Sequence, residues 1–187
     1  MSVHKISKSL AWVLTLGGAA GLYASWSMTI EKLHLLENPD YVAPCDVNAF
    51  ITCTSVMGFP QSAVFGFPNQ LIGLVGFAVV VTLGVLGLNK VKFPHWILNG
   101  LWAGTFLAII GVHWLAYHSI FVINLLCPWC MVVWAATIAV FSYLSIDRLA
   151  HWAPNNSVAQ FVVRWGNLIV AIWYLVFVAT ILFKFFG

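Results

Sequence analysis

The sequence predicts an all-α integral membrane protein with five transmembrane helices, and three observations carry this prediction. Hydrophobic residues make up 62% of the 187 residues and charged residues only 7%, whereas soluble domains carry about a quarter charged residues. Five apolar runs approach the ~20 residues that a membrane-spanning helix needs. The eight basic residues are scattered beside these runs, which excludes the clustered basic surface of a nucleic-acid-binding protein.

The first predicted span covers residues 10–30. A cleaved signal peptide is the alternative, but its apolar region would be only about 7 to 15 residues long. Trp12, Tyr23 and Trp26 lie toward the two ends of the run, as aromatic residues do at membrane boundaries. We therefore expect an uncleaved helix and a single membrane domain over residues 1–187.

A polar loop over residues 31–67 follows the first span and carries Cys45 and Cys53. It holds four of the five acidic residues, Glu31, Glu37, Asp40 and Asp46. This composition predicts a segment outside the bilayer.

Four further spans complete the predicted topology, at residues 69–88, 96–118, 125–145 and 165–186. Hardly any polar residue separates the third span from the fourth, so their connection is tight. Asn124 is the residue type that caps a helix N-terminus, and we consider it a candidate cap for the fourth span.

The orientation follows from the basic residues of the short loops, which favour the cytoplasmic side. Two basic residues, Lys32 and Lys184, fall on one side of the five-span topology. Six fall on the other, namely Lys5, Lys8, Lys90, Lys92, Arg148 and Arg164. The N-terminus is thus predicted to be cytoplasmic, and the cysteines to face outside, where disulfides form and persist.

Cys127 and Cys130 open the fourth span in a Cys-x-x-Cys arrangement. The spacing places both sulfurs on one helix face, close enough to form a disulfide. Pro128 fits if it occupies the first helical turn, where the helix dipole favours a reactive thiolate. A structural disulfide or a zinc half-site are alternatives, but zinc needs four converging ligands and the other two cysteines lie in a distant segment.

Three separated motifs resemble those of the vitamin K epoxide reductase family. They are Cys45-Asp46-Val47 with Cys53, the run from Val64 to Gly73 that enters the second span, and Cys127-Pro128-Trp129-Cys130. The likeness covers roughly residues 10–147. The single domain and the fifth helix resemble an actinobacterial member of the family.

This resemblance implies a four-helix bundle around a quinone, with the first loop over its external mouth. It implies a bacterial cytoplasmic-membrane enzyme that oxidises an extracytoplasmic DsbA-like or thioredoxin-like protein. The electrons would pass to a membrane quinone of the menaquinone or ubiquinone type, without a metal or nucleotide. Cys130 would lie next to the quinone and Cys127 would exchange with Cys53, while Cys45 would meet the soluble partner.

The resemblance also suggests quinone contacts. Asn69 matches an asparagine that donates to a quinone carbonyl; the alternative is a helix N-cap for the second span, and the two roles are compatible. Trp134 stands where vertebrate members have a tyrosine, and an indole N–H can donate but not accept a hydrogen bond. We expect Met57 and Phe59 at the quinone too, with Phe59 replacing a serine usual in the family. Asp46 is either an electrostatic tether for the loop or a solvated acid.

Other functions stay open at this point. The chain could reduce vitamin K quinone or epoxide as animal relatives do. A DsbB-type oxidase performs the same reaction, but it carries its Cys-x-x-Cys in the first external loop. The chain could also be a membrane protein with two structural disulfides and no enzymatic activity.

Overall fold

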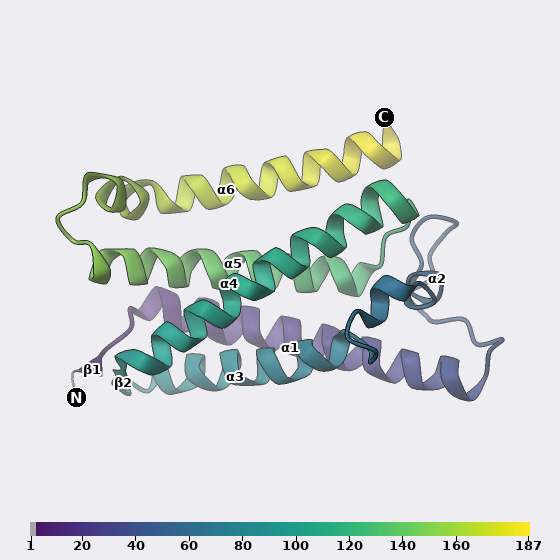
Figure 1. Cartoon of the computed structure of the whole chain (residues 1–187), viewed down its shortest axis with the longest axis horizontal. Helices are drawn as coiled ribbons and strands as arrows, with labels where there is room; N and C mark the ends of the chain where they lie inside the picture. The colour runs from purple at the N-terminus through teal and green to yellow at the C-terminus, as the bar shows by residue number, and fades with distance from the viewer. Residues whose placement is uncertain (1–2) are drawn as a thin grey trace.

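The computed structural model describes residues 3–187 and is mostly helical (Figure 1). Its long helices are α1 (Lys8–Glu37), α3 (Gln70–Leu88), α4 (His95–Tyr117), α5 (Pro128–Trp152) and α6 (Ser157–Phe186). The remaining elements are short: β1 (Val3–His4), α2 (Cys53–Met57), the 3₁₀ turn η1 (Pro60–Ala63), β2 (Phe93–Pro94) and the π-helical turn η2 (His118–Ile123).

The predicted all-α membrane fold is confirmed. Within residues 3–187, four helical segments are long and apolar enough to cross a membrane: Gln70–Leu88, His95–Ile123, Pro128–Trp152 and Ser157–Phe186. α1 has 30 residues but does not reach the same apolarity, because small and hydroxyl-bearing residues replace larger apolar ones along it. A transmembrane α1 and the orientation of the bundle stay predictions.

Three helix boundaries differ clearly from the sequence prediction. α5 continues to Trp152, beyond the expected end at residue 145. α1 continues to Glu37, seven residues beyond the expected end, so part of the predicted loop is helical. α6 begins at Ser157 rather than at residue 165. The Asn156 side chain accepts hydrogen bonds from the backbone N–H groups of Val158 (2.8 Å) and Ala159 (3.3 Å), so a helix cap stands where a polar link was expected.

α1 packs most closely against α3, because glycines let the two backbones approach. A Cβ atom at Gly18 would lie 2.7 Å from the backbone nitrogen of Val81, and one at Gly84 would lie 2.5 Å from that of Thr15. Small residues at a helix interface are the usual means of close packing in membranes. This explains why α1 is less apolar than the other helices.

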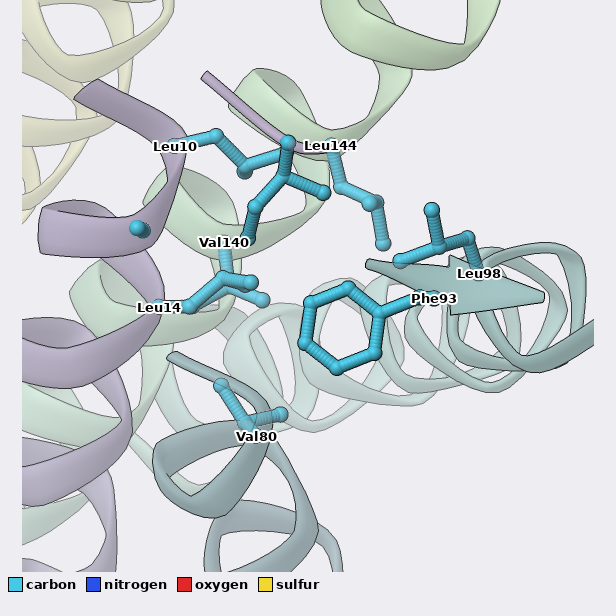
Figure 2. Close-up of a cluster of buried hydrophobic side chains, with 9 residues drawn as sticks. Leu10, Leu14, Val80, Phe93, Leu98, Val140 and Leu144 are labelled. Atoms are coloured by element: carbon cyan, nitrogen blue, oxygen red, sulfur yellow. The ribbon is translucent and has the colours of Figure 1, made fainter. Parts of the chain in front are cut away.

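A hydrophobic core joins α1, α3, α4 and α5 at the end of the bundle where β1 pairs with β2. The Phe93 ring from β2 lies among the side chains of the four helices (Figure 2). The core residues are Ile6, Leu10, Ala11, Leu14, Val80, Phe93, Leu98, Val140 and Leu144. Figure 1 shows α2 at the opposite end of the bundle, the same end at which α6 terminates.

Candidate redox site

The start of α5 presents Cys127 and Cys130 as the sequence predicts. Pro128 occupies the first turn, and Cys127 is the N-cap residue, whose Sγ accepts a hydrogen bond from the backbone N–H of Cys130 (3.5 Å). Asn124 was a candidate N-cap residue for this helix, but it does not occupy the N-cap position of α5. It has a left-handed backbone (φ 57°), which asparagine tolerates, and the chain then runs extended to Cys127 before α5 begins.

The loop cysteines form a disulfide, Cys45–Cys53, with their Cα atoms 5.8 Å apart. Cys53 opens α2, whose N-cap is Thr52. Asp46 is not a freely solvated acid, because its Oδ1 accepts hydrogen bonds from the backbone N–H of Cys53 (2.6 Å) and of Thr54 (3.1 Å). Burial raises the pKa of Asp46, but hydrogen bonds from Thr54, Thr52 and Cys53 outweigh it, and the pKa lies below its ordinary value.

A short parallel bridge joins the loop to the segment before α5. It pairs Ile51 with Leu126. The N–H of Thr52 donates to the carbonyl of Leu126 (2.8 Å), and the N–H of Leu126 donates to the carbonyl of Phe50 (2.7 Å). Cys53 lies two residues after Ile51, and Cys127 directly follows Leu126, so the bridge brings the two cysteines close together.

The bridge brings a disulfide sulfur against a free thiol. Sγ of Cys53 and Sγ of Cys127 are 3.4 Å apart, and both residues are fully buried. Cys127 and Cys130 are free thiols. All four cysteines therefore lie together at one end of the bundle, with one pair oxidised and the other reduced.

A cavity of about 780 Å³ lies beneath the thiols, lined mainly by α3 and α4. Cys130 lines it, and its sulfur is 3.8 Å from the thioether sulfur of Met28 on α1. Most of the other lining residues are apolar, with a minority of hydroxyl and carboxamide side chains among them. The volume falls within the range of pockets that hold small organic ligands, ~300–1,000 Å³.

The model of the vitamin K epoxide reductase family matches residues 12–145, well over half of the chain. The chain belongs to this family. As a member it is a membrane oxidoreductase, and the match covers the loop disulfide, the Cys127/Cys130 pair and the cavity, but not α6.

Three of the four residues expected at the quinone line the cavity, namely Met57, Asn69 and Trp134. The fourth residue, Phe59, was also expected there, but it does not line the cavity. Its side chain is 37% exposed, since the turn at Pro60 follows it and η1 places other side chains inward. Ser62 lines the cavity instead, and its hydroxyl donates to the carbonyl of Met57 (2.9 Å). A serine three residues after Phe59 thus contributes a hydroxyl to this part of the cavity.

Asn69 holds the N-cap position of α3 but makes no side-chain capping bond. Its Nδ2 donates to the carbonyl of Gln61 (2.7 Å) and its Oδ1 accepts from the N–H of Val64 (3.1 Å). The carboxamide therefore closes the loop over residues 61–69. One hydrogen on Nδ2 is left for a further acceptor.

Sequence reasoning missed Met28 and Ser25, two α1 residues that line the cavity. An apolar or small residue on a helix gives no chemical signal, so neither was predictable. Both ring nitrogens of His113 on α4 are engaged: one faces the carbonyl of Ile109 (2.9 Å), and the other accepts from the indole N–H of Trp173 (3.2 Å).

Cys45, Asp46 and Cys53 have ligand atoms within 4.8 Å of one another, the arrangement of a small metal site. The two sulfurs are joined to each other, however, and the carboxylate already accepts two backbone N–H bonds. In this state these three residues serve the disulfide and the α2 N-terminus rather than an ion.

Proposed function

We propose that the protein transfers electrons from an extracytoplasmic DsbA-like or thioredoxin-like dithiol to a membrane quinone, and so generates disulfides in the partner. One observation carries this proposal: the sulfur of Cys127, a free thiol, lies 3.4 Å from a sulfur of the loop disulfide. Thiol–disulfide exchange requires one thiolate in contact with one disulfide.

The cycle begins at the loop. A dithiol of the partner reduces the Cys45–Cys53 disulfide and leaves as a disulfide, which gives the loop two electrons and two protons. Cys45 is the sulfur that the partner attacks, because Cys53 is fully buried and Cys45 is only half-buried. Cys45 also borders a surface groove with Trp26 and Trp129, which leaves space beside it for another protein.

The second exchange joins the loop to α5. The Cys53 thiolate attacks Cys127 of an oxidised Cys127–Cys130 pair, so that a Cys53–Cys127 bond forms and Cys130 leaves as a thiolate. Cys45 then attacks Cys53 and releases Cys127. The loop disulfide is regenerated and the α5 pair is reduced, which is the redox state of this structure.

The α5 pair then passes two electrons and two protons to a quinone of the menaquinone or ubiquinone type in the cavity and re-forms its own disulfide. Cys130, which lines the cavity, is the sulfur nearest this acceptor. The second hydrogen on Asn69 Nδ2 and the indole N–H of Trp134 are available for the carbonyls of the acceptor. The apolar lining suits a quinone ring, because it excludes water from the exchange.

The topology in the proposal follows the basic residues: the protein is a multi-pass protein of the bacterial cytoplasmic membrane with its redox end outside. Two structural disulfides without activity would not place a reduced pair against an oxidised pair, which favours the relay.

The Cys130→Ala variant tests the relay. In it, Cys127 attacks Cys53 of the loop disulfide and Cys45 leaves as a thiol, and a maleimide that alkylates Cys45 blocks the reverse reaction. With a protease site inserted near Lys92, the cut fragments should stay joined on a non-reducing gel and separate on reduction. The further change Cys127→Ala should release them. Fragments that never join would refute the relay and favour structural disulfides.

A second measurement identifies the acceptor. Mass spectrometry of the isoprenoid that co-purifies in detergent should find a quinone, and adding that quinone should convert the alkylatable Cys127/Cys130 thiols into a disulfide. A protein that turns over vitamin K epoxide but transfers no electrons from a dithiol protein would instead be a vitamin K reductase proper.

A further inference from the structure

α6 lies outside the residues matched to the family, yet its C-terminal half contacts the redox loop. Phe50, which precedes the bridge residues, has its ring centroid 5.9 Å from that of Phe185 and 5.8 Å from that of Phe186. Both partners belong to the last turn of α6. In Figure 1 this end of α6 and the loop that carries α2 lie at the same end of the bundle.

The contact extends from the loop to the cavity through one apolar cluster. Phe177, Ile181 and Phe185 of α6 pack against a buried cluster that contains Leu126 and Trp134, and Ile51, the bridge partner of Leu126, packs against the same cluster. Phe177 and Trp134 meet edge to face with ring centroids 5.7 Å apart. The bridge is therefore held by two backbone hydrogen bonds, and it borders the apolar cluster to which α6 contributes.

Hydrogen bonds outside this cluster also anchor α6 to α4 and α5. The indole of Trp173 donates to His113 on α4 (3.2 Å), and the Tyr143 hydroxyl of α5 donates to Asn167 of α6 (3.0 Å). Tyr174 donates to the carbonyl of Ala135 on α5. Interhelical hydrogen bonds in an apolar medium fix the helix in place. α6 can thus act as a rigid support for the loop, since its own position is set independently of it.

We infer that α6 positions the redox loop: Phe185, together with Phe177 and Ile181, holds the Phe50–Thr52 segment in register with Leu126 so that Cys53 stays against Cys127. The inference rests on the proposed relay. Phe185 is a positioning residue, because it does not line the cavity and its ring lies against Phe50 of the loop. Without this support the two backbone bonds of the bridge would lose the side-chain packing that α6 supplies beside them.

The experiment measures the internal exchange directly. In the Cys130→Ala protein with maleimide present, Phe185→Ala should slow the accumulation of the Cys53–Cys127 bond by about threefold to tenfold, the range expected for loss of an aromatic contact. Phe185→Leu should restore most of the rate. Phe183→Ala is the matched control, since Phe183 lies on the same helix end but is 80% exposed, and it should leave the rate unchanged.

A second readout separates positioning from damage to the fold. In a protein with Cys45→Ala and Cys53→Ala, dithiothreitol reduces the Cys127–Cys130 pair directly, and quinone reduction then does not use the loop. Phe185→Ala should change this loop-independent rate by less than about twofold. An equal loss in both assays would show a general structural role and overturn the inference.

Two further outcomes are distinct. If the Cys130→Ala protein with an intact α6 never forms the Cys53–Cys127 bond, the relay itself is wrong and the inference falls with it. If the bond forms and Phe185→Ala forms it at the same rate, the relay stands and α6 does not position the loop. Non-additive effects of Phe50→Ala and Phe185→Ala would show that the two rings act on each other.

Discussion

Asp46 offers the sharpest test of how the loop is held. The change is Asp46→Ala, which removes a carboxylate that accepts N–H bonds from Cys53 (2.6 Å) and Thr54 (3.1 Å). Hydrogen bonds to charged groups contribute about 1.5–3 kcal/mol each when shielded. Asp46 is only partly buried, and water can replace part of the loss, so we expect roughly 1–2 kcal/mol for the two together.

These two hydrogen bonds hold the N-terminus of α2 in place, and they thereby keep Cys53 beside Cys127. A cost of roughly 1–2 kcal/mol corresponds to a slowing of about fivefold to thirtyfold. The assay is the rate at which the Cys53–Cys127 bond accumulates in the Cys130→Ala protein. Asp40→Ala is the control, since Asp40 is an exposed acid of the same loop. A rate within twofold of the parent would refute the tether.

The pH dependence of the same contact has a definite sign. The folded-state pKa of Asp46 is lowered, so its contribution to loop stability is fully present above the ordinary carboxyl pKa of 3.8 and is lost as the pH falls through the folded-state value. Loop protection from proteolysis should therefore be constant near neutrality and decline only at acid pH, and Asp46→Ala should abolish that decline.

Three other outcomes are expected. An impermeant thiol reagent on intact reduced cells should label Cys45 but not a cysteine introduced near Lys90; the opposite pattern would invert the topology. Asn69→Ala should weaken quinone reduction more than it lowers the folded yield, because the acceptor loses a donor; equal losses would mean that Asn69 only closes its loop. Gly84→Ala should destabilise the detergent-solubilised protein by about 1–3 kcal/mol through overpacking against Thr15, and so lower its thermal midpoint. Gly104→Ala is the control and should not lower the thermal midpoint, because a Cβ atom at Gly104 meets nothing within 4 Å.

The helices could be predicted because each is an apolar run of sufficient length, and the second predicted span agrees with α3 to within one residue. The start of α6 could not, since Gln160 and Arg164 resemble a polar link and only the cap at Asn156 sets the true boundary. The end of α1 was missed for a related reason. Its last two turns carry charged residues outside the apolar run, and hydropathy alone ends the helix too early.

The redox site was only partly predictable. The two cysteine pairs, their spacing and their shared end of the bundle follow from topology. The pairing of Ile51 with Leu126 does not, because a bridge of single residues has no periodicity to recognise. The contacts of Met28 and the exclusion of Phe59 from the cavity depend on side-chain direction at a turn, which residue type does not reveal.

The break between α4 and α5 explains why this bridge exists. Backbone polar groups near the membrane must find partners within the protein, and the extended residues before α5 cannot use helical bonds. The N–H of Leu125 donates to the carbonyl of Ser119 (3.1 Å), whereas Leu126 has both of its polar groups bonded to the redox loop. The loop therefore completes the hydrogen bonding of the bundle.

This requirement constrains how the loop can move during turnover. Lifting Cys53 away from Cys127 would break both bonds to Leu126 and leave its N–H and carbonyl unpaired, which costs more in an apolar setting than in water. The Cys45 side of the loop lacks such bonds to α5 and borders the surface groove. Exchange with the partner is thus expected to move Cys45 while Cys53 stays at the bundle, and hydrogen exchange should be slower at Thr52 and Leu126 than at Val47 and its neighbours.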